Sequence, residues 1–366
     1  MAMFKCLVKS ETRELLRDYL PHRGRFIDVQ KERPELASVE KTFQDLVDAM
    51  GAKYSLKAPV EFGLFESDKF NAFADRVKDR YVIGLHTATC ESFLALFQTM
   101  LSFPGILPEV GQPSSENAPS PPFRTISEFF PTSPTSTSPR VPIDDARRRF
   151  ALTLYWFALT AVVLHELAHI TNGHIDWKGA KNGKTAFCEF EELDDVFQGI
   201  PSVEHHTLER DADKCAFTWG CGIIKTSTGM FAHEFLSTNR LRIWYYAFAY
   251  CMVWRAMDQR CWTLEKITGK HPPKPVRILL GLDAVYHLLV AQPSYGFTKT
   301  DALSLVETVA TVTEDTTAQL IAGLPVLDGM RGALSVESEA QIEQYVVCWK
   351  RLRPELLPHS WLPLPE

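Results

Sequence analysis

The chain has 366 residues, 45% of them hydrophobic, which argues against a disordered chain because a substantial core can be buried. Its formal net charge of -6 provides no overall basic field, so nucleic acid is not expected as a partner. None of the eight cysteines forms a C-x-x-C pair, which argues against a disulfide framework or a zinc ribbon.

Residues 1–68 are expected to form a helical lead-in. Leu15, Leu16, Tyr19 and Leu20 form its clearest apolar face at helical spacing. The opening stretch becomes charged before it reaches the length of a secretory apolar run. The sequence therefore predicts a cytoplasmic protein.

Residues 69–102 are predicted to form a hairpin followed by a helix. Two short apolar runs flank the polar stretch DRVKD, as in two paired strands. Residues 89–102 then show helical periodicity, with Thr89 as the expected N-cap. Main-chain pairing at an exposed edge of this hairpin could bind an extended substrate.

Residues 103–142 are dense in proline and serine, a composition typical of a flexible loop or linker. Such a composition buries too little apolar surface to offset the entropy lost on ordering. A plain tether is the main interpretation of this segment, and a cover over an active-site cleft is the alternative.

Residues 143–290 are expected to form a helical catalytic core. Residues 143–172 read as one long helix that ends near Gly173. Its apolar run is shorter than the roughly 18–20 residues that span a membrane, so a buried core helix is expected. Another helix is predicted to begin at Pro201 or Ser202. Further helices are predicted at 237–258, 273–290, 301–322 and 337–353, the last two in a C-terminal region, 291–366, that closes with a proline-rich tail.

The stretch HELAHITNGH contains the clearest chemical motif. His165 and His169 are four residues apart, so on a helix both side chains project from one face and can reach one ion. In this H-E-x-x-H pattern two neutral imidazoles bind Zn²⁺, and the carboxylate between them, here Glu166, takes a proton from water. Two satisfied core histidines are the alternative, but burying them beside an ionisable glutamate without a metal is costly.

A catalytic zinc site usually has three protein ligands, and LERDADKCAF supplies a candidate for the third. Glu209 and Asp213 are four residues apart, so they share a helix face. Glu209 is then the third ligand, and Asp213 holds a ligand imidazole from behind. Arg210 and Lys214 offer the alternative, in which the two carboxylates form a solvated, ion-paired helix face.

Two more histidines are candidates for catalysis. His205 lies four residues before Glu209 on the same face and could donate a hydrogen bond to a developing oxyanion. His174 could do the same, could support a metal ligand, or could be an ordinary loop histidine. These three interpretations of His174 stay open at the level of the sequence.

In chain order, N-A-F-A at 71–74, H-E-L-A-H and E-R-D-A-D resemble the marks of the glutamate-ligand zincin metallopeptidases of the HtpX type. The resemblance covers residues 71–217, although the proline- and serine-rich segment interrupts it. It implies an α+β, mainly helical fold, in which a zincin-like core has a small antiparallel sheet or hairpin beside the H-E-x-x-H helix. It also implies zinc bound by His165, His169 and Glu209, with Glu166 as general base and Asp213 behind the ligands.

With its added His174, the chain is also similar to the Lit-type peptidases, soluble bacterial proteases linked to phage exclusion. These are described as cutting a translation elongation factor. This second resemblance implies a protein substrate and a role in phage defence.

The sequence therefore predicts a zinc-dependent endopeptidase that acts on a protein or peptide, with no membrane span. Two alternatives stay open, a zinc-stabilised binding or regulatory module without turnover and a hydrolase of small amides. Glu166 favours catalysis, because a purely structural zinc site usually closes its fourth position with Cys or His.

Overall fold

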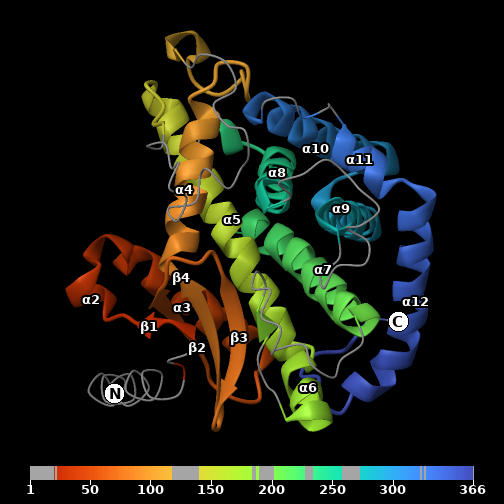
Figure 1. The fold of residues 1–366 in the computed structure, drawn as a ribbon. Helices are drawn as coiled ribbons and strands as arrows, with labels where there is room; N and C mark the ends of the chain where they lie inside the picture. The colour runs from red at the N-terminus through yellow and green to blue at the C-terminus, as the bar shows by residue number, and fades with distance from the viewer. Residues whose placement is uncertain are drawn as a thin grey trace. The chain divides into compact units, whose positions relative to one another are not determined.

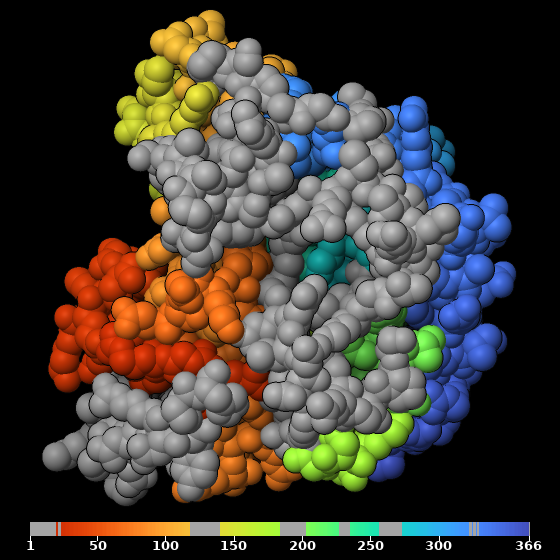
Figure 2. Space-filling model, viewed as in Figure 1, coloured from red at the N-terminus to blue at the C-terminus, as the bar shows by residue number. Residues whose placement is uncertain are grey.

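The computed structural model describes residues 20, 23–117, 140–183, 187–188, 202–226, 234–257, 273–321, 324 and 327–365, which are coloured in Figure 2. The described part is mainly helical with one small β-sheet, which confirms the α+β, mainly helical class. The chain divides into two compact units. Unit 1 comprises residues 1–91, 169–199 and 354–366, and unit 2 comprises residues 92–168 and 200–353.

Unit 1 contains the sheet, which has five strands among the described residues in the order β1-β2-β4-β3-β5 (Figure 1). The strands are β1 (Arg25–Phe26), β2 (Val60–Glu66), β3 (Ala72–Val77), β4 (Arg80–His86) and β5 (Phe187–Cys188). The expected hairpin is confirmed as β3 and β4, which are antiparallel. However, β2 and β4 are parallel, so the sheet is mixed and larger than the predicted hairpin.

The outer edge of β3 is paired in part with another segment of the chain. Phe73 pairs with Cys188 and Ala74 pairs with Phe187, in antiparallel register. The other strand of the hairpin, β4, pairs with β2 along its length. The expectation of an exposed hairpin edge for a substrate is therefore wrong at these positions.

The helices of unit 1 pack against the sheet or against one another. They are α2 (Val29–Glu32), the short 3-10 helix η2 (Pro34–Leu36), α3 (Ala37–Tyr54) and α6 (His174–Asn182). The helix α3 packs on β2 through Val39, Phe43, Val47 and Met50, which recur at helical spacing. The lead-in expected over 1–68 thus contains strands as well as helices. Leu15, Leu16 and Tyr19 lie outside the described residues, and Leu20 is buried in the core beside Phe26.

The helix α4 (Thr87–Leu101) begins two residues before the expected cap. Thr89 therefore lies inside the helix and is not its N-cap. Its hydroxyl accepts a hydrogen bond from Asn71 N at 2.9 Å and donates one to Asn71 O at 2.8 Å. The side chain of Thr89 thus holds the backbone at the start of β3.

Unit 2 is helical in its described part. Its helices are α5 (Asp145–Thr171), α7 (Ser202–Thr226), α8 (Asn239–Met257), α9 (Lys274–Ala291), α10 (Lys299–Leu320), α11 (Asp328–Ala333) and α12 (Val336–Leu356), with the short 3-10 helices η3 (Pro113–Ser115), η5 (Glu234–Leu236) and η7 (Pro293–Tyr295). The ends of the predicted long helices agree with the structure to within about three residues, as expected of boundaries inferred from sequence. The helices α8 and α9 each pack on both α7 and α10.

By length and composition, α5 is the one described helix that could cross a membrane. Of its most apolar 18-residue window, 83% is buried inside the protein. A helix that is apolar on all sides belongs in a protein core as well as in a membrane. Its burial agrees with the expectation of a core helix.

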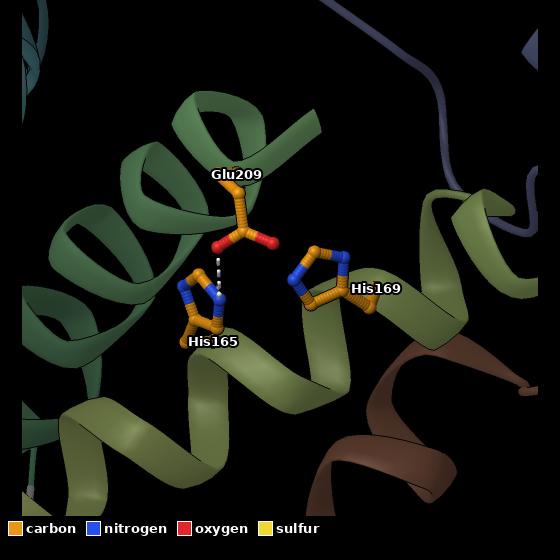
Figure 3. A group of neighbouring side chains, drawn as sticks. All are labelled: His165, His169 and Glu209. Carbon is orange, nitrogen blue, oxygen red and sulfur yellow. Dashed lines mark ion pairs between the residues drawn. The ribbon is translucent and has the colours of Figure 1, made fainter. Parts of the chain in front are cut away.

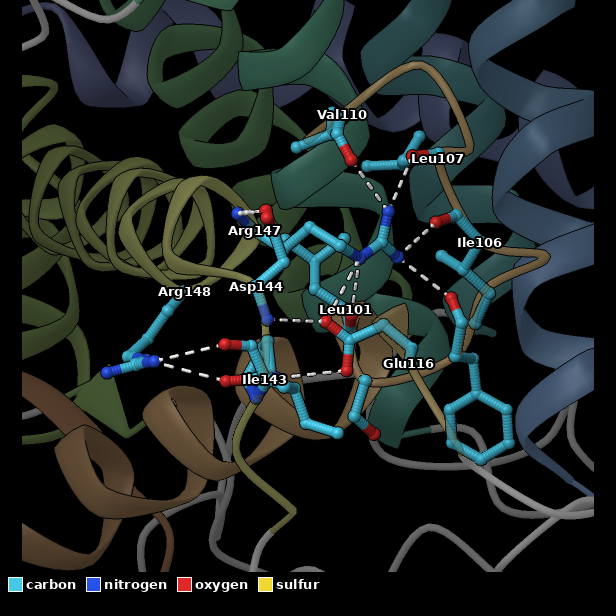
Figure 4. A network of polar contacts seen from close by, with 12 residues as sticks. Leu101, Ile106, Leu107, Val110, Glu116, Ile143, Asp144, Arg147 and Arg148 are labelled. Atoms are coloured by element: carbon cyan, nitrogen blue, oxygen red, sulfur yellow. Dashed lines mark hydrogen bonds and ion pairs between the residues drawn. The ribbon is translucent and has the colours of Figure 1, made fainter. Parts of the chain in front are cut away.

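The segment 103–117 is packed against the start of α5, although a flexible linker was expected from residue 103. Arg147 holds this segment in place, and its side chain is fully buried (Figure 4). The guanidinium donates to five backbone carbonyls, those of Leu101, Phe103, Ile106, Leu107 and Val110, at 2.7–3.0 Å. The Glu116 carboxylate accepts hydrogen bonds from the backbone of Ile143 and Asp144, just before α5. Residues 118–139, the rest of the expected linker, lie outside the described residues.

Candidate metal centre

The last turns of α5 carry His165 and His169. The helix is continuous from unit 2 into unit 1, so its geometry places both side chains on one face. Each side chain is 1% exposed. The helix ends as expected at Gly173, whose φ of 80° lies in the left-handed region that glycine enters without strain.

The helix α7 supplies the third side chain of the group. Glu209 is also 1% exposed, and its Oε2 lies 3.4 Å from His165 Nε2. One possible ligand atom from each of His165, His169 and Glu209 lies within 4.8 Å of the others. Figure 3 shows the Glu209 carboxylate between the two imidazole rings. Among the described residues this is the single group of its kind, and it could hold a metal ion.

The donor set fits a transition metal. Bonds of 2.0–2.2 Å in a tetrahedral site put neighbouring ligand atoms ~3.4 Å apart, close to the observed separation of His165 and Glu209. Two imidazoles with one carboxylate suit zinc better than calcium or magnesium, which prefer oxygen ligands throughout. The burial of Glu209 and Asp213 also shows that the solvated acidic face does not occur.

Asp213 supports His165 from the side away from Glu209. Its Oδ1 lies 3.0 Å from His165 Nδ1, so a carboxylate faces each nitrogen of that ring. This contact favours the tautomer with the proton on Nδ1, which leaves Nε2 for a metal. Burial alone would raise the pKa of Asp213, but the charge of Arg277 and hydrogen bonds from His165 and Arg277 outweigh it and keep that pKa below its usual value.

Two residues that the sequence did not single out complete the surroundings of Asp213. Arg277 on α9 donates to both carboxylate oxygens, at 2.6 and 2.7 Å, and its Nη2 lies 3.4 Å from Glu209 Oε2. Its guanidinium stacks on Trp254 at 3.7 Å from the ring centroid. Tyr250 on α8 donates its hydroxyl to Asp213 Oδ1 at 2.7 Å. Burial, followed by the charge of Asp213, raises the pKa of Tyr250 well above its usual value and keeps it a donor.

His174 begins α6 and contacts His169. Its Nδ1 lies 2.9 Å from His169 Nδ1, and the side chain is fully buried. One of these nitrogens must carry the proton that the other accepts. If His169 binds a metal through Nε2, its Nδ1 donates to His174. Of the three interpretations left open for His174, this contact favours support of a metal ligand.

His205 lies where the sequence placed it, on the face of Glu209. Its Nε2 is 3.6 Å from Glu209 Oε1, and its side chain is 3% exposed. Its role as an oxyanion donor stays a prediction. The neighbouring His206 instead faces α12, where its Nδ1 lies 3.1 Å from the Tyr345 hydroxyl.

Glu166 follows His165 on α5. Its side chain is 1% exposed, as buried as the three possible ligands. A carboxylate at this depth has lost most of its contact with bulk water, so its charge depends on the groups around it. Its role as a base stays a prediction.

The chain was compared with protein-family models, curated proteins and solved structures, and none of these comparisons gave a match.

Proposed function

We propose that the chain is a zinc-dependent endopeptidase of the glutamate-ligand zincin type. The observation that carries this proposal is the buried group of His165, His169 and Glu209, with Glu166 beside it on the same helix. Three protein side chains would hold the ion, which is the number usual in catalytic zinc sites. When bound, zinc polarises a peptide carbonyl and lowers the pKa of a coordinated water toward 7.

Glu166 moves the proton in this proposal. Its carboxylate takes a proton from the water that attacks the peptide carbonyl and delivers it to the amine nitrogen as the C–N bond breaks. His205 donates a hydrogen bond to the developing oxyanion from the neighbouring face of α7. The burial of Glu166 supports this role, because its carboxylate is shielded from bulk water, as are the three possible ligands.

The remaining polar contacts orient the ligands. Asp213 holds the His165 ring and is itself fixed by Arg277 and Tyr250. His174 holds the ring of His169. Such contacts behind metal ligands typically govern affinity and geometry at the metal.

The proposed substrate is a cytoplasmic protein or peptide. The resemblance to Lit-type peptidases makes a translation factor the first candidate and phage defence the proposed setting. A zinc-stabilised module without turnover is the competing function, and the experiment below separates the two.

The test compares the wild type with Glu166→Gln, Glu209→Gln and the exposed control Glu339→Gln. Glu166→Gln should keep zinc and lower the cleavage rate by about 10²–10⁴-fold, since it removes the proton acceptor alone. Glu209→Gln should lose both zinc and cleavage, and Glu339→Gln should lose neither. Labelling of new protein N-termini in cells expressing each variant, with metal analysis of the pure proteins, provides both measurements.

The possible results separate the alternatives. If wild type and Glu166→Gln both bind zinc and produce the same set of N-termini, the chain is the module without turnover. If the wild type binds no zinc, the metal site itself is wrong.

A further inference from the structure

A pocket lies in unit 1, lined by the end of β3, by α6 and by residues 358–361. Its volume is about 470 Å³, within the range of small-molecule sites. The residues that define its chemistry are Lys57, Arg76, Asp176, Pro358, His359 and Trp361. They come from four stretches of the chain that are far apart in sequence.

The charges of this pocket favour an anion. Lys57 donates to the backbone carbonyl of Ser360 at 2.6 Å, and no carboxylate of the described residues lies within ion-pair distance of it. Arg76 pairs with Asp176 at 3.0 Å. Asp176 also accepts a hydrogen bond from Tyr81 at 2.5 Å, so its charge is already shared. Two permanent cations thus face one carboxylate.

The pocket also has an apolar wall. Trp361 contributes its indole ring, which is fixed by an edge contact with Tyr81 at 4.9 Å between ring centroids. Pro358 adds a second rigid apolar surface. Pockets that combine a flat aromatic surface with a few charged groups bind organic molecules of matching shape and charge.

We propose that this pocket binds a small organic anion, with its carboxylate or phosphate at Lys57 and Arg76 and a flat apolar part against Trp361. Lysine and arginine donate charge-assisted hydrogen bonds to such groups, which are stronger than neutral ones. This site is separate from the metal centre and does not depend on hydrolysis.

The pocket is joined to the end of the metal-binding helix. Trp361 donates its backbone N–H to Thr171 O at 2.7 Å, two residues after His169. Asp176 lies on the first turn of α6, which begins with His174, the residue in contact with His169. At Gly173, an added Cβ would lie 2.6 Å from the backbone carbonyl carbon of His359. The backbones at these two residues are therefore in close contact. An anion that shifts Trp361 or α6 would therefore also shift His169.

We therefore assign the anion the role of an effector of the metal centre, an assignment that rests on the proposed function. Linkage requires the effect to be mutual, because an anion that changes zinc affinity must have its own affinity changed by zinc by the same factor.

Binding is tested by titration calorimetry of the full chain with phenyl phosphate, benzoate, inorganic phosphate and neutral benzyl alcohol. Phenyl phosphate or benzoate should bind more tightly than inorganic phosphate, and benzyl alcohol should not bind. Lys57→Gln should weaken binding about tenfold, since one charged hydrogen bond is lost. Lys53→Gln, an exposed lysine on α3 outside the pocket, should leave it unchanged. Absence of binding by both organic anions, or equal binding by Lys57→Gln and wild type, overturns the site.

The effector role is tested by zinc affinity, measured against a chromophoric chelator with and without benzoate. Benzoate should change the zinc affinity of the wild type by about fivefold or more and that of Lys57→Gln much less. An unchanged affinity in the wild type overturns the effector role and leaves anion binding in place. Neither readout involves peptide cleavage, so both results are independent of whether the chain is a peptidase.

Discussion

Arg147 and Arg277 are both fully buried in unit 2, but their partners differ in kind. Arg147 donates to five uncharged backbone carbonyls, whereas Arg277 donates to the Asp213 carboxylate and approaches that of Glu209. The first arrangement orders a stretch of backbone, and the second orients side chains at the candidate metal centre. The partners of a buried arginine, and not its burial, therefore indicate whether it stabilises the fold or positions side chains at a site.

The electrostatic cost of burial differs in the same way. Burial lowers the pKa of Arg147, and the nearest carboxylate, Glu116, opposes this only from 3.9 Å. Arg277 has two carboxylates within 3.4 Å. Loss of Arg147 should therefore affect folding, whereas loss of Arg277 should affect the metal centre.

The largest effect is expected for Arg147→Lys, which removes contacts between the guanidinium and the five backbone carbonyls. A lysine has three donors and a different shape, so it cannot serve five carbonyls. We expect the free energy of unfolding to fall by about 2–4 kcal/mol, because buried carbonyls lose a partner. Denaturant unfolding measures this change, which should be the same with and without zinc.

The control for this variant is Arg148→Lys at the next position, whose side chain is 45% exposed. It should change stability by less than about 0.5 kcal/mol. Equal losses in the two variants would show that the carbonyl contacts of Arg147 do not order residues 101–110.

Arg277→Lys changes the buried arginine beside the candidate metal centre. The charge is kept, but the two-pronged contact with Asp213 is lost, so the His165 ring is held less firmly. We expect zinc affinity to fall about tenfold, with a smaller loss of stability than in Arg147→Lys. Competition with a chromophoric chelator measures the affinity. A zinc affinity equal to that of the wild type would make Arg277 a purely structural cation.

Tyr250→Phe is the smallest of the three changes. It removes a single hydroxyl donor from Asp213 and leaves the ring packing in place. Loss of one hydrogen bond to a charged group costs about 1.5–3 kcal/mol at most, and Arg277 compensates in part. We expect a drop of a few-fold in zinc affinity, measured as above. A loss larger than that of Arg277→Lys would reverse the order of importance.

The candidate metal-binding group could be predicted because helix geometry is local. His165 and His169 need only a spacing of four residues, and the same spacing relates Glu209 to Asp213. The left-handed turn at Gly173 was predicted for a similar reason. The residues behind the ligands are a different matter, since Arg277 lies 64 residues and Tyr250 37 residues from Asp213. No local pattern identifies such a partner.

The parallel pairing in the sheet and the order of segment 103–117 escaped prediction for the same physical reason. The strand β2 is paired in parallel with β4, a contact between non-consecutive strands that no hairpin signal indicates. Proline and serine content predicted a flexible segment from residue 103. Four carbonyls of this segment are held by Arg147, which lies 37–44 residues away in sequence. The composition of a segment predicts how that segment behaves alone. It gives no information about an arginine far away in the sequence that binds its carbonyls.

The hydrogen bond from Trp361 to Thr171 has a consequence for the order of events during synthesis. During translation, the two histidines of α5 leave the ribosome almost two hundred residues before Trp361, whose backbone N–H binds the end of their helix. A nascent chain therefore carries the histidines of the candidate metal centre long before Trp361 can hold the end of their helix, so we expect the candidate centre to assemble only after translation through residue 361.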